Sequence, residues 1–410
     1  MNNDIKILRQ LAREYHAAAH EPRNDERRRL HTAVNDLKMI RPVVLISEIP
    51  WPQMNFNGEL TCFCEDPFFR SYEWQMRSSL FHYRYFPADM YLNAQLGVGK
   101  VVHSTGIGLS CQDEILKSEQ KTDIVSHSYI DQVPDEASLE KIHNPVISYD
   151  EAATNANWNK LGDAVGDILP VKKYGMGYIY FATWDDIPRY HGPQNCLIDL
   201  ADRPEFMHKL VQKITEAKMS EFAQKEELGL LDADNDDLHC TAALVSDLPG
   251  KIEGDKVTRK NIWGRGMAQI FGSVSKDMHE EFDIEYMKNT IGTCGLAYYG
   301  CCEPLHNKVD IVSKIPNLRK IGCTPWADVD VEAEAVGKRF VLSLKTNPAA
   351  VATPALDKDN LRKELKKVLD ACHRNGCSCD ITLKDISTTA DRPQNIFEWE
   401  QIAMEMALNY

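Results

Sequence analysis

Apolar and polar positions follow two different periods along this chain. Short apolar runs are typical of buried strands, and stretches with apolar residues every three or four positions are typical of amphipathic helices. The apolar runs predict strands at residues 42–49, 178–182, 228–231, 268–271, 295–299, 318–323, 339–345 and 380–384. Helical spacing predicts helices between most of them, notably at 205–227, 279–288, 359–373 and 393–407.

Alternation of strands and helices is typical of parallel βα units, and six or more such units favour a closed barrel over an open sheet. We therefore predict a (β/α)₈ TIM barrel over residues 41–410. An N-terminal helical extension, residues 1–40, precedes it, with apolar positions on one helical face. Residues 110–165 are polar and loop-rich, which predicts an irregular insertion in the barrel.

Residues 51–87 are rich in aromatic side chains and show no clear period. We expect this segment to cover a binding cleft or to pack at an interface, which makes a homodimer plausible.

The charge of the chain narrows the class of partner. Its 410 residues include 47 Lys and Arg against 61 Asp and Glu, a net charge of −14, and they contain no basic block. Nucleic acid is therefore not expected as a partner.

The apolar runs are too short for a membrane span, which needs about 20 residues. The N-terminus, MNNDIKILRQ, lacks the apolar core of a signal peptide, so we expect a cytoplasmic protein with its 12 cysteines reduced. No GxGxxG follows a predicted strand and no GxxxxGK[ST] occurs, so neither a dinucleotide site nor a P-loop is indicated.

In a TIM barrel the active site lies at the carboxyl ends of the strands. Polar or aromatic residues follow six of the predicted strands at that end. The candidates are Glu48, Trp51, Asn235, His239, Cys240, Cys301, Cys302, Glu303, Trp326, Lys345, Lys384 and Asp385.

The segment YYGCCEPLH, residues 298–306, is the sharpest local feature. Zinc binds cysteine, histidine and carboxylate side chains, and a catalytic zinc site keeps one position open. Cys301 or Cys302, with Glu303 and the distant His239, would form such a site. The alternative is that the two cysteines pack as small buried residues.

Two lysines follow apolar strands at the same predicted edge. Lys345 and Lys384, with Asp385 beside the second, predict an anion clamp or a group that supports developing negative charge. The alternative is a solvated lysine at a strand end. Glu48 and Asn235 are candidate substrate-binding residues, and Trp51 and Trp326 are candidate walls for a flat or apolar substrate.

Four segments carry a resemblance to a known family: YYGCCEPLH, TPWADV (324–329), SLKTNP (343–348) and LKDIST (383–388). Together they resemble the uroporphyrinogen decarboxylase superfamily, and its corrinoid-linked methyltransferases more than the decarboxylase itself. The resemblance implies a (β/α)₈ barrel with its site at the strand carboxyl ends. It also implies zinc held by a His-x-Cys pair, whose positions here are occupied by Tyr299 and Cys301. The arginine-rich RQAGRY motif of the decarboxylases is absent.

These observations predict a zinc-dependent methyltransferase that moves a methyl group between a small substrate and a corrinoid. The chain has no DxHxxG corrinoid-binding motif, so a partner protein would carry the corrinoid. One alternative is a metal-independent decarboxylase of a small carboxylated substrate, with Lys345, Lys384 and Asp385 as its chemical groups. A second alternative is a barrel that binds a ligand without enzymatic activity.

Overall fold

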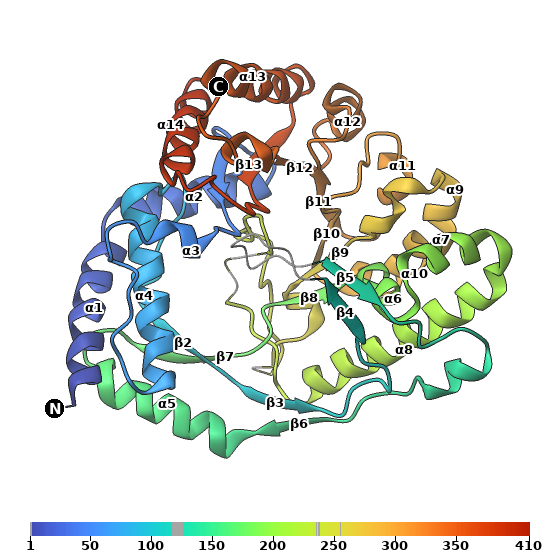
Figure 1. Cartoon of the computed structure of the whole chain (residues 1–410), viewed down its shortest axis with the longest axis horizontal. Helices are drawn as coiled ribbons and strands as arrows, with labels where there is room; N and C mark the ends of the chain where they lie inside the picture. Colours follow the sequence, from blue (N-terminus) through green and yellow to red (C-terminus); the bar gives the residue numbers. More distant parts are fainter. Residues whose placement is uncertain (1, 117–125, 235, 237, 255) are drawn as a thin grey trace.

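The structure is a computed structural model that describes residues 2–116, 126–234, 236, 238–254 and 256–410. At its centre lies a parallel sheet with the strand order β1-β13-β12-β11-β10-β9-β8 (Figure 1). The strands are β1 (Val43–Ile46), β8 (Tyr178–Phe181), β9 (Trp263–Gly266), β10 (Leu296–Tyr299), β11 (Leu318–Cys323), β12 (Val341–Lys345) and β13 (Ser378–Leu383). Every neighbouring pair in this order is parallel.

Beside β8, Leu231 pairs with Met176 in an isolated parallel bridge. The strand expected at 228–231 is thus reduced to one bridging residue. Within the described ranges no ladder joins the edge strands β1 and β8. The fold is therefore mixed α/β with a seven-stranded parallel sheet, whereas the sequence predicted eight strands in a closed barrel.

The main hydrophobic core lies on the face of this sheet that the C-terminal helices cover, which is called the outer face below. It packs strand residues such as Ile321, Leu342 and Ile381 against helix residues such as Leu365 and Trp399. The C-terminal helices are α11 (Val309–Val312), α12 (Val329–Val336), α13 (Lys358–Asn375) and α14 (Gln394–Leu408). The strands and helices predicted from residue 295 onward agree closely with those of the structure, so that part of the sequence prediction is confirmed.

A second hydrophobic core holds the N-terminal region together. Leu8 and Leu11 on α1 (Asn3–Ala19) pack with Met76 and Leu80 on α4 (Pro67–Tyr85) and with Leu161 on α5 (Glu151–Val165). The other helices of this region are α2 (Arg23–Asn35) and α3 (Trp51–Met54).

The expectation that 51–87 is irregular is wrong, because α4 spans 19 of those residues. The Asp66 side chain accepts a hydrogen bond from the backbone N–H of Phe68, and Pro67 occupies the first turn. Both are ordinary helix-start features that aromatic composition obscured.

The insertion expected at 110–165 is more regular than predicted. Three two-stranded sheets, β2-β7, β3-β6 and β4-β5, lie in and around it. Their strands are β2 (Leu96–Gly99), β3 (Val101–Ser104), β4 (Asp113–Leu116), β5 (Ser126–Tyr129), β6 (Ile147–Asp150) and β7 (Val171–Tyr174). Each strand has only four residues, which is too short to show a reliable alternation in sequence.

Between β8 and β10 the chain forms α6 (Thr183–His191), α7 (Pro193–Asp202), α8 (Pro204–Glu227), α9 (Lys276–His279) and α10 (Glu285–Lys288). The strand expected at 268–271 lies earlier, as β9 at Trp263–Gly266, and Gln269–Ser273 is a 3₁₀ turn. Strand β9 reads WGRG, whose glycines and arginine disfavour a strand by composition. No helix in the described part of the chain is long and apolar enough to cross a membrane.

Candidate functional site

The opposite face of the sheet, called the inner face, carries polar side chains. Side chains alternate between faces along a strand, so the inner positions of β11, β12 and β13 recur every second residue. They carry Lys320, Ser343, Lys345 and Asp380, all buried, and Lys384 follows at the end of β13. Charges are rarely buried unless they are paired, so this face is built around specific polar contacts.

An ion pair anchors the base of this face. Lys320 Nζ lies 2.9 Å from Asp380 Oδ2, and both side chains are fully buried. The Thr241 hydroxyl donates to the same carboxylate oxygen at 2.8 Å. Although burial opposes it, the charges of Lys320 and Lys345 hold the pKa of Asp380 below its usual value. The chain segment around Thr241 is thereby tied to the inner face of the sheet.

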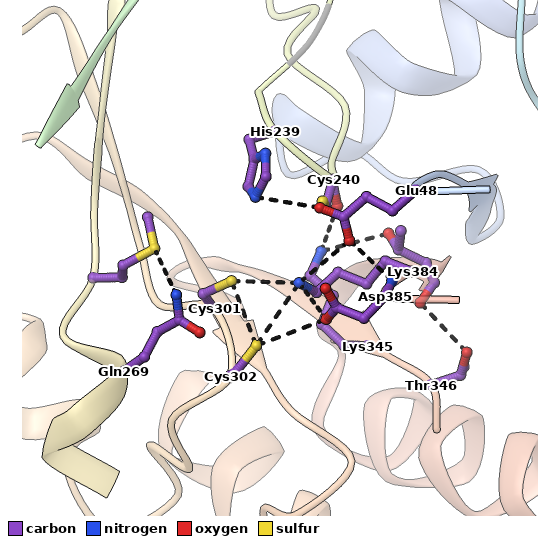
Figure 2. A network of polar contacts seen from close by, with 12 residues as sticks. Glu48, His239, Cys240, Gln269, Cys301, Cys302, Lys345, Thr346, Lys384 and Asp385 are labelled. Atoms are coloured by element: carbon purple, nitrogen blue, oxygen red, sulfur yellow. Dashed lines mark hydrogen bonds and ion pairs between the residues drawn. The ribbon is translucent and has the colours of Figure 1, made fainter. Parts of the chain in front are cut away.

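Two cysteines and two charged residues meet above that base (Figure 2). Lys384 Nζ lies 3.4 Å from Cys301 Sγ, 3.8 Å from Cys302 Sγ and 2.7 Å from Asp385 Oδ2. The two sulfurs are 3.7 Å apart. Gly300, with φ of 104°, makes the turn that places the cysteines, and a Cβ there would lie 2.7 Å from Leu305.

The neighbours of Cys301 lower the pKa of its thiol and favour the thiolate. The thiol of Cys302 donates to its sulfur and lowers the pKa of Cys301 well below the usual value. His239, Arg265 and Lys384 lower that pKa further, against the effect of burial. Cys302 shows the opposite change, since donating to Cys301 raises the pKa of its own thiol.

Beside the thiol pair, Glu48, His239 and Cys240 form a group suited to a metal ion. Their ligand atoms all lie within 4.8 Å of one another, and His239 Nε2 is 3.6 Å from Glu48 Oε1. Hydrogen bonds to the thiols of Cys240 and Cys301 raise the pKa of His239 to about 9, although burial acts in the other direction. One carboxylate, one imidazole and one thiol are a donor set that fits zinc.

Backbone strain coincides with this group. Glu48, His239, Cys240 and Asp385 all have positive φ, at 50°, 20°, 66° and 56°. Non-glycine residues rarely adopt such angles, and those that do are concentrated at functional sites. Asp385 is linked to the group directly, because its backbone N–H donates to Glu48 Oε2 at 2.9 Å.

Of the predicted zinc ligands, the structure brings together His239, Cys301 and Cys302 but turns Glu303 away. The Glu303 carboxylate accepts hydrogen bonds from the backbone N–H groups of Ala268 and Cys301, each at 3.0 Å. Burial raises the pKa of Glu303 to about 7. This side chain thus ties the loop after β9 to the loop after β10.

The predicted lysines are both at the site, in different surroundings. Lys345 donates to the Cys240 carbonyl oxygen at 2.6 Å and to the Ser343 hydroxyl at 2.8 Å, and burial lowers its pKa. Lys384 has a raised pKa, because Cys301 and Asp385 offset the effect of burial. Lys345 therefore supports the backbone that carries Cys240, while Lys384 faces the thiol pair.

The two predicted wall residues differ in their surroundings. Trp51 is half-buried, with its ring edge-on to Trp74 and Phe81 at centroid distances of 5.7 and 6.4 Å. Trp326, in the loop after β11, is 67% exposed. Asn235 lies outside the described residues.

Sequence reasoning missed Arg265 and Tyr180. Arg265 is the third residue of β9 and fully buried, and the Tyr180 ring on β8 packs against both Arg265 and His239. A polar residue inside the WGRG strand could have indicated an inward-facing arginine, but the strand was expected five residues later.

Comparisons with known proteins give a distant likeness in fold. No protein-family model matches the chain, and no curated protein matches it. Among solved structures, it is similar to a methyltransferase from Methanosarcina mazei, with a TM-score of 0.46 and 11% sequence identity. That match covers 92% of this chain and 97% of the other. Because the similarity is this low, the chemistry of the site has to be inferred from its own residues.

Proposed function

We propose that this chain is an enzyme that holds zinc through Glu48, His239 and Cys240 and transfers a methyl group to or from a small substrate. The observation that carries the proposal is the group of three unlike ligand atoms within 4.8 Å of one another. They meet beside the carboxyl ends of β1 and β13, where α/β folds of this kind place their active sites.

Bound there, zinc would supply a Lewis acid that lowers the pKa of a substrate thiol or polarises the bond to the methyl group. The protein's own residues prepare that position. Lys384, between the thiol pair and the carboxylates of Glu48 and Asp385, neutralises negative charge that gathers in the site. Lys345 fixes the backbone of Cys240 through its carbonyl oxygen.

The other carrier of the methyl group is proposed to be a corrinoid on a partner protein, as the family resemblance implies. No residue of this chain is assigned to bind that corrinoid. The proposed partners are thus a small-molecule substrate and a corrinoid protein.

Metal analysis of protein purified without chelators tests the zinc site. We expect about one zinc per chain in the wild type. Glu48→Gln, His239→Ala and Cys240→Ser should each lose most of it. Cys196→Ser, a buried thiol in a separate hydrophobic cluster, is the matched control and should keep it. Wild-type protein without metal would contradict the proposal, and loss of zinc in Cys302→Ser alone would move the site to the thiol pair.

Methyl transfer is tested with methylcobalamin as the probe. The zinc-loaded protein should demethylate it in the presence of a small thiol, as followed by the cobalt absorption spectrum, and Cys240→Ser should not. Unchanged spectra with zinc-loaded protein and a range of thiols would contradict methyl transfer while leaving the zinc site standing.

Metal-independent decarboxylation is the second candidate, and the Lys384–Asp385 pair favours it. A buried ammonium 2.7 Å from a carboxylate can support negative charge that develops as carbon dioxide leaves. Chelator-treated protein that releases carbon dioxide from a carboxylated substrate, with Cys240→Ser equally active, would favour this candidate.

A further inference from the structure

Arg265 is a buried cation with poor partners. Its side chain is 0% exposed, and its Nη1 donates at 2.9 Å to the sulfur of Met267. A thioether is a weak acceptor, so this bond satisfies a guanidinium poorly. Its Nε and Nη2 have no hydrogen-bond partner. Two unsatisfied donors on one buried guanidinium are costly and need an explanation.

The other cations on the inner face have ion-pair or hydrogen-bond partners. Lys320 is paired with Asp380, Lys384 with Asp385, and Lys345 donates to neutral oxygens. In the described part of the chain, Arg265 makes no ion pair with a carboxylate. Burial lowers the pKa of the guanidinium, while Tyr298, the thiol of Cys301 and Tyr180 raise it. The edge of the guanidinium formed by Nε and Nη2 thus remains without a hydrogen-bond acceptor.

Two tyrosines enclose the guanidinium. Its Cζ lies 5.0 Å from the ring centroid of Tyr298 and 5.4 Å from that of Tyr180. Tyr180 is 38% exposed, and its ring lies edge-on to His239 at 6.0 Å. Tyr180 therefore contacts both Arg265 and the proposed zinc ligand His239.

We infer that Arg265 binds a carboxylate group of the substrate beside Cys301, and that a rotation of the Tyr180 side chain opens the guanidinium to the site. A carboxylate offers two acceptors in a plane, which matches two neighbouring N–H groups of a guanidinium. The substrate class is then a small carboxylic acid whose reacting group lies beyond the Tyr180 ring. The inference rests on the proposed function for the place of the reacting centre.

Binding is measured by calorimetry and thermal unfolding with benzoate and acetate as probes. Benzamide and acetamide are neutral controls of the same shape, and sodium chloride keeps the ionic strength equal. We expect the carboxylates, and not the amides, to raise the melting temperature of the wild type in a concentration-dependent way. Arg265→Lys keeps the positive charge without the planar fork, so it should bind benzoate about tenfold more weakly. Arg265→Met should lose the response.

Arg259→Met is the matched control. It removes an arginine that already has a carboxylate partner, Glu226, at 2.9 Å, and it should leave benzoate binding unchanged. Carboxylates that stabilise the wild type no more than the amides do, or equal benzoate affinity in wild type and Arg265→Lys, would overturn the inference.

Repeating the measurement on chelator-treated protein separates this inference from the proposed function. Benzoate binding that depends on Arg265 in chelator-treated protein would support the anion site independently of the zinc proposal, which fails only if protein purified without chelators holds no zinc. Zinc bound by the triad without carboxylate binding would leave the proposed function standing and overturn only the role of Arg265.

Discussion

Lys384 Nζ lies 3.4 Å from Cys301 Sγ, and a cation at that distance favours the thiolate over the thiol. The contact joins the end of β13 to the loop after β10. It therefore couples the charge state of one strand end to that of another.

Replacing Lys384 tests that coupling. Lys384→Met removes the cation, so the pKa of Cys301 should rise and its thiolate fraction at low pH should fall. In a Cys302→Ser background stripped of metal, the rate at which iodoacetamide alkylates Cys301 is measured against pH. We expect Lys384→Met to move the midpoint of that profile to higher pH. Lys363→Met, an exposed position on α13, is the control. An unchanged midpoint of the pH profile would show that Lys384 does not stabilise the thiolate.

The Lys320–Asp380 pair predicts a large and recoverable loss of stability. Asp380→Asn leaves the Lys320 ammonium buried without its counter-charge, which should cost about 3–5 kcal/mol of unfolding free energy. The double variant Lys320→Met with Asp380→Leu removes both charges and should recover much of that loss. Denaturant unfolding measures both, and a double variant as unstable as Asp380→Asn would contradict this account.

A Glu303 variant tests whether this side chain holds two loops together through their backbone N–H groups or binds the metal. In Glu303→Gln only one terminal atom can accept, so one of the two backbone N–H groups at Ala268 and Cys301 loses its partner. We expect a loss of about 1–3 kcal/mol in unfolding free energy with zinc content unchanged. Loss of zinc without loss of stability would instead make Glu303 a ligand, as the sequence predicted.

Glu332 on α12 predicts a pH dependence of stability. It is fully buried, and burial raises its pKa to about 8, although the thiol of Cys323 acts in the other direction. The unfolded chain releases this proton near its usual pKa of about 4.3, whereas the folded protein keeps it. Its contribution to stability is therefore complete below about pH 4.3 and declines progressively up to about pH 8.

Glu332→Gln removes that decline, because an amide does not titrate in this range. The melting temperature of the variant should exceed that of the wild type, and the difference should grow from about pH 5 to about pH 8. Glu334→Gln, exposed on the same helix, should follow the wild-type curve. Parallel curves for Glu332→Gln and wild type would show that Glu332 is not held protonated.

The bounds of strands and helices were predicted best where the periodic pattern of apolar residues was long. Strand β11 and helices α8, α13 and α14 have long apolar patterns, and their bounds were close. The loops after β10 and β13 were expected at one edge of the sheet, and Cys301, Cys302 and Lys384 do meet there. Parallel strands bring their carboxyl ends together whatever the loops contain, so this proximity followed from fold class alone.

Contacts that depend on side-chain direction could not be predicted in this way. Glu303 is adjacent to Cys302 in sequence, yet its carboxylate points to the backbone of Ala268. Glu48 was expected to bind substrate, and nothing in its surroundings in sequence indicates that it lies beside His239 and Cys240. Arg265 was missed because WGRG lacks the β-branched composition of a buried strand.

The segment that carries His239 and Cys240 is fastened inside the sheet through Thr241, whose hydroxyl bonds to Asp380 on the last strand, while Glu48 follows the first strand. The three proposed ligands therefore come together only after both ends of the chain have docked. Zinc bound by these three residues would therefore be retained only by a chain that has folded completely. A chain that stops before β13 would lack the anchor for two of the ligands, although it would contain all three residues.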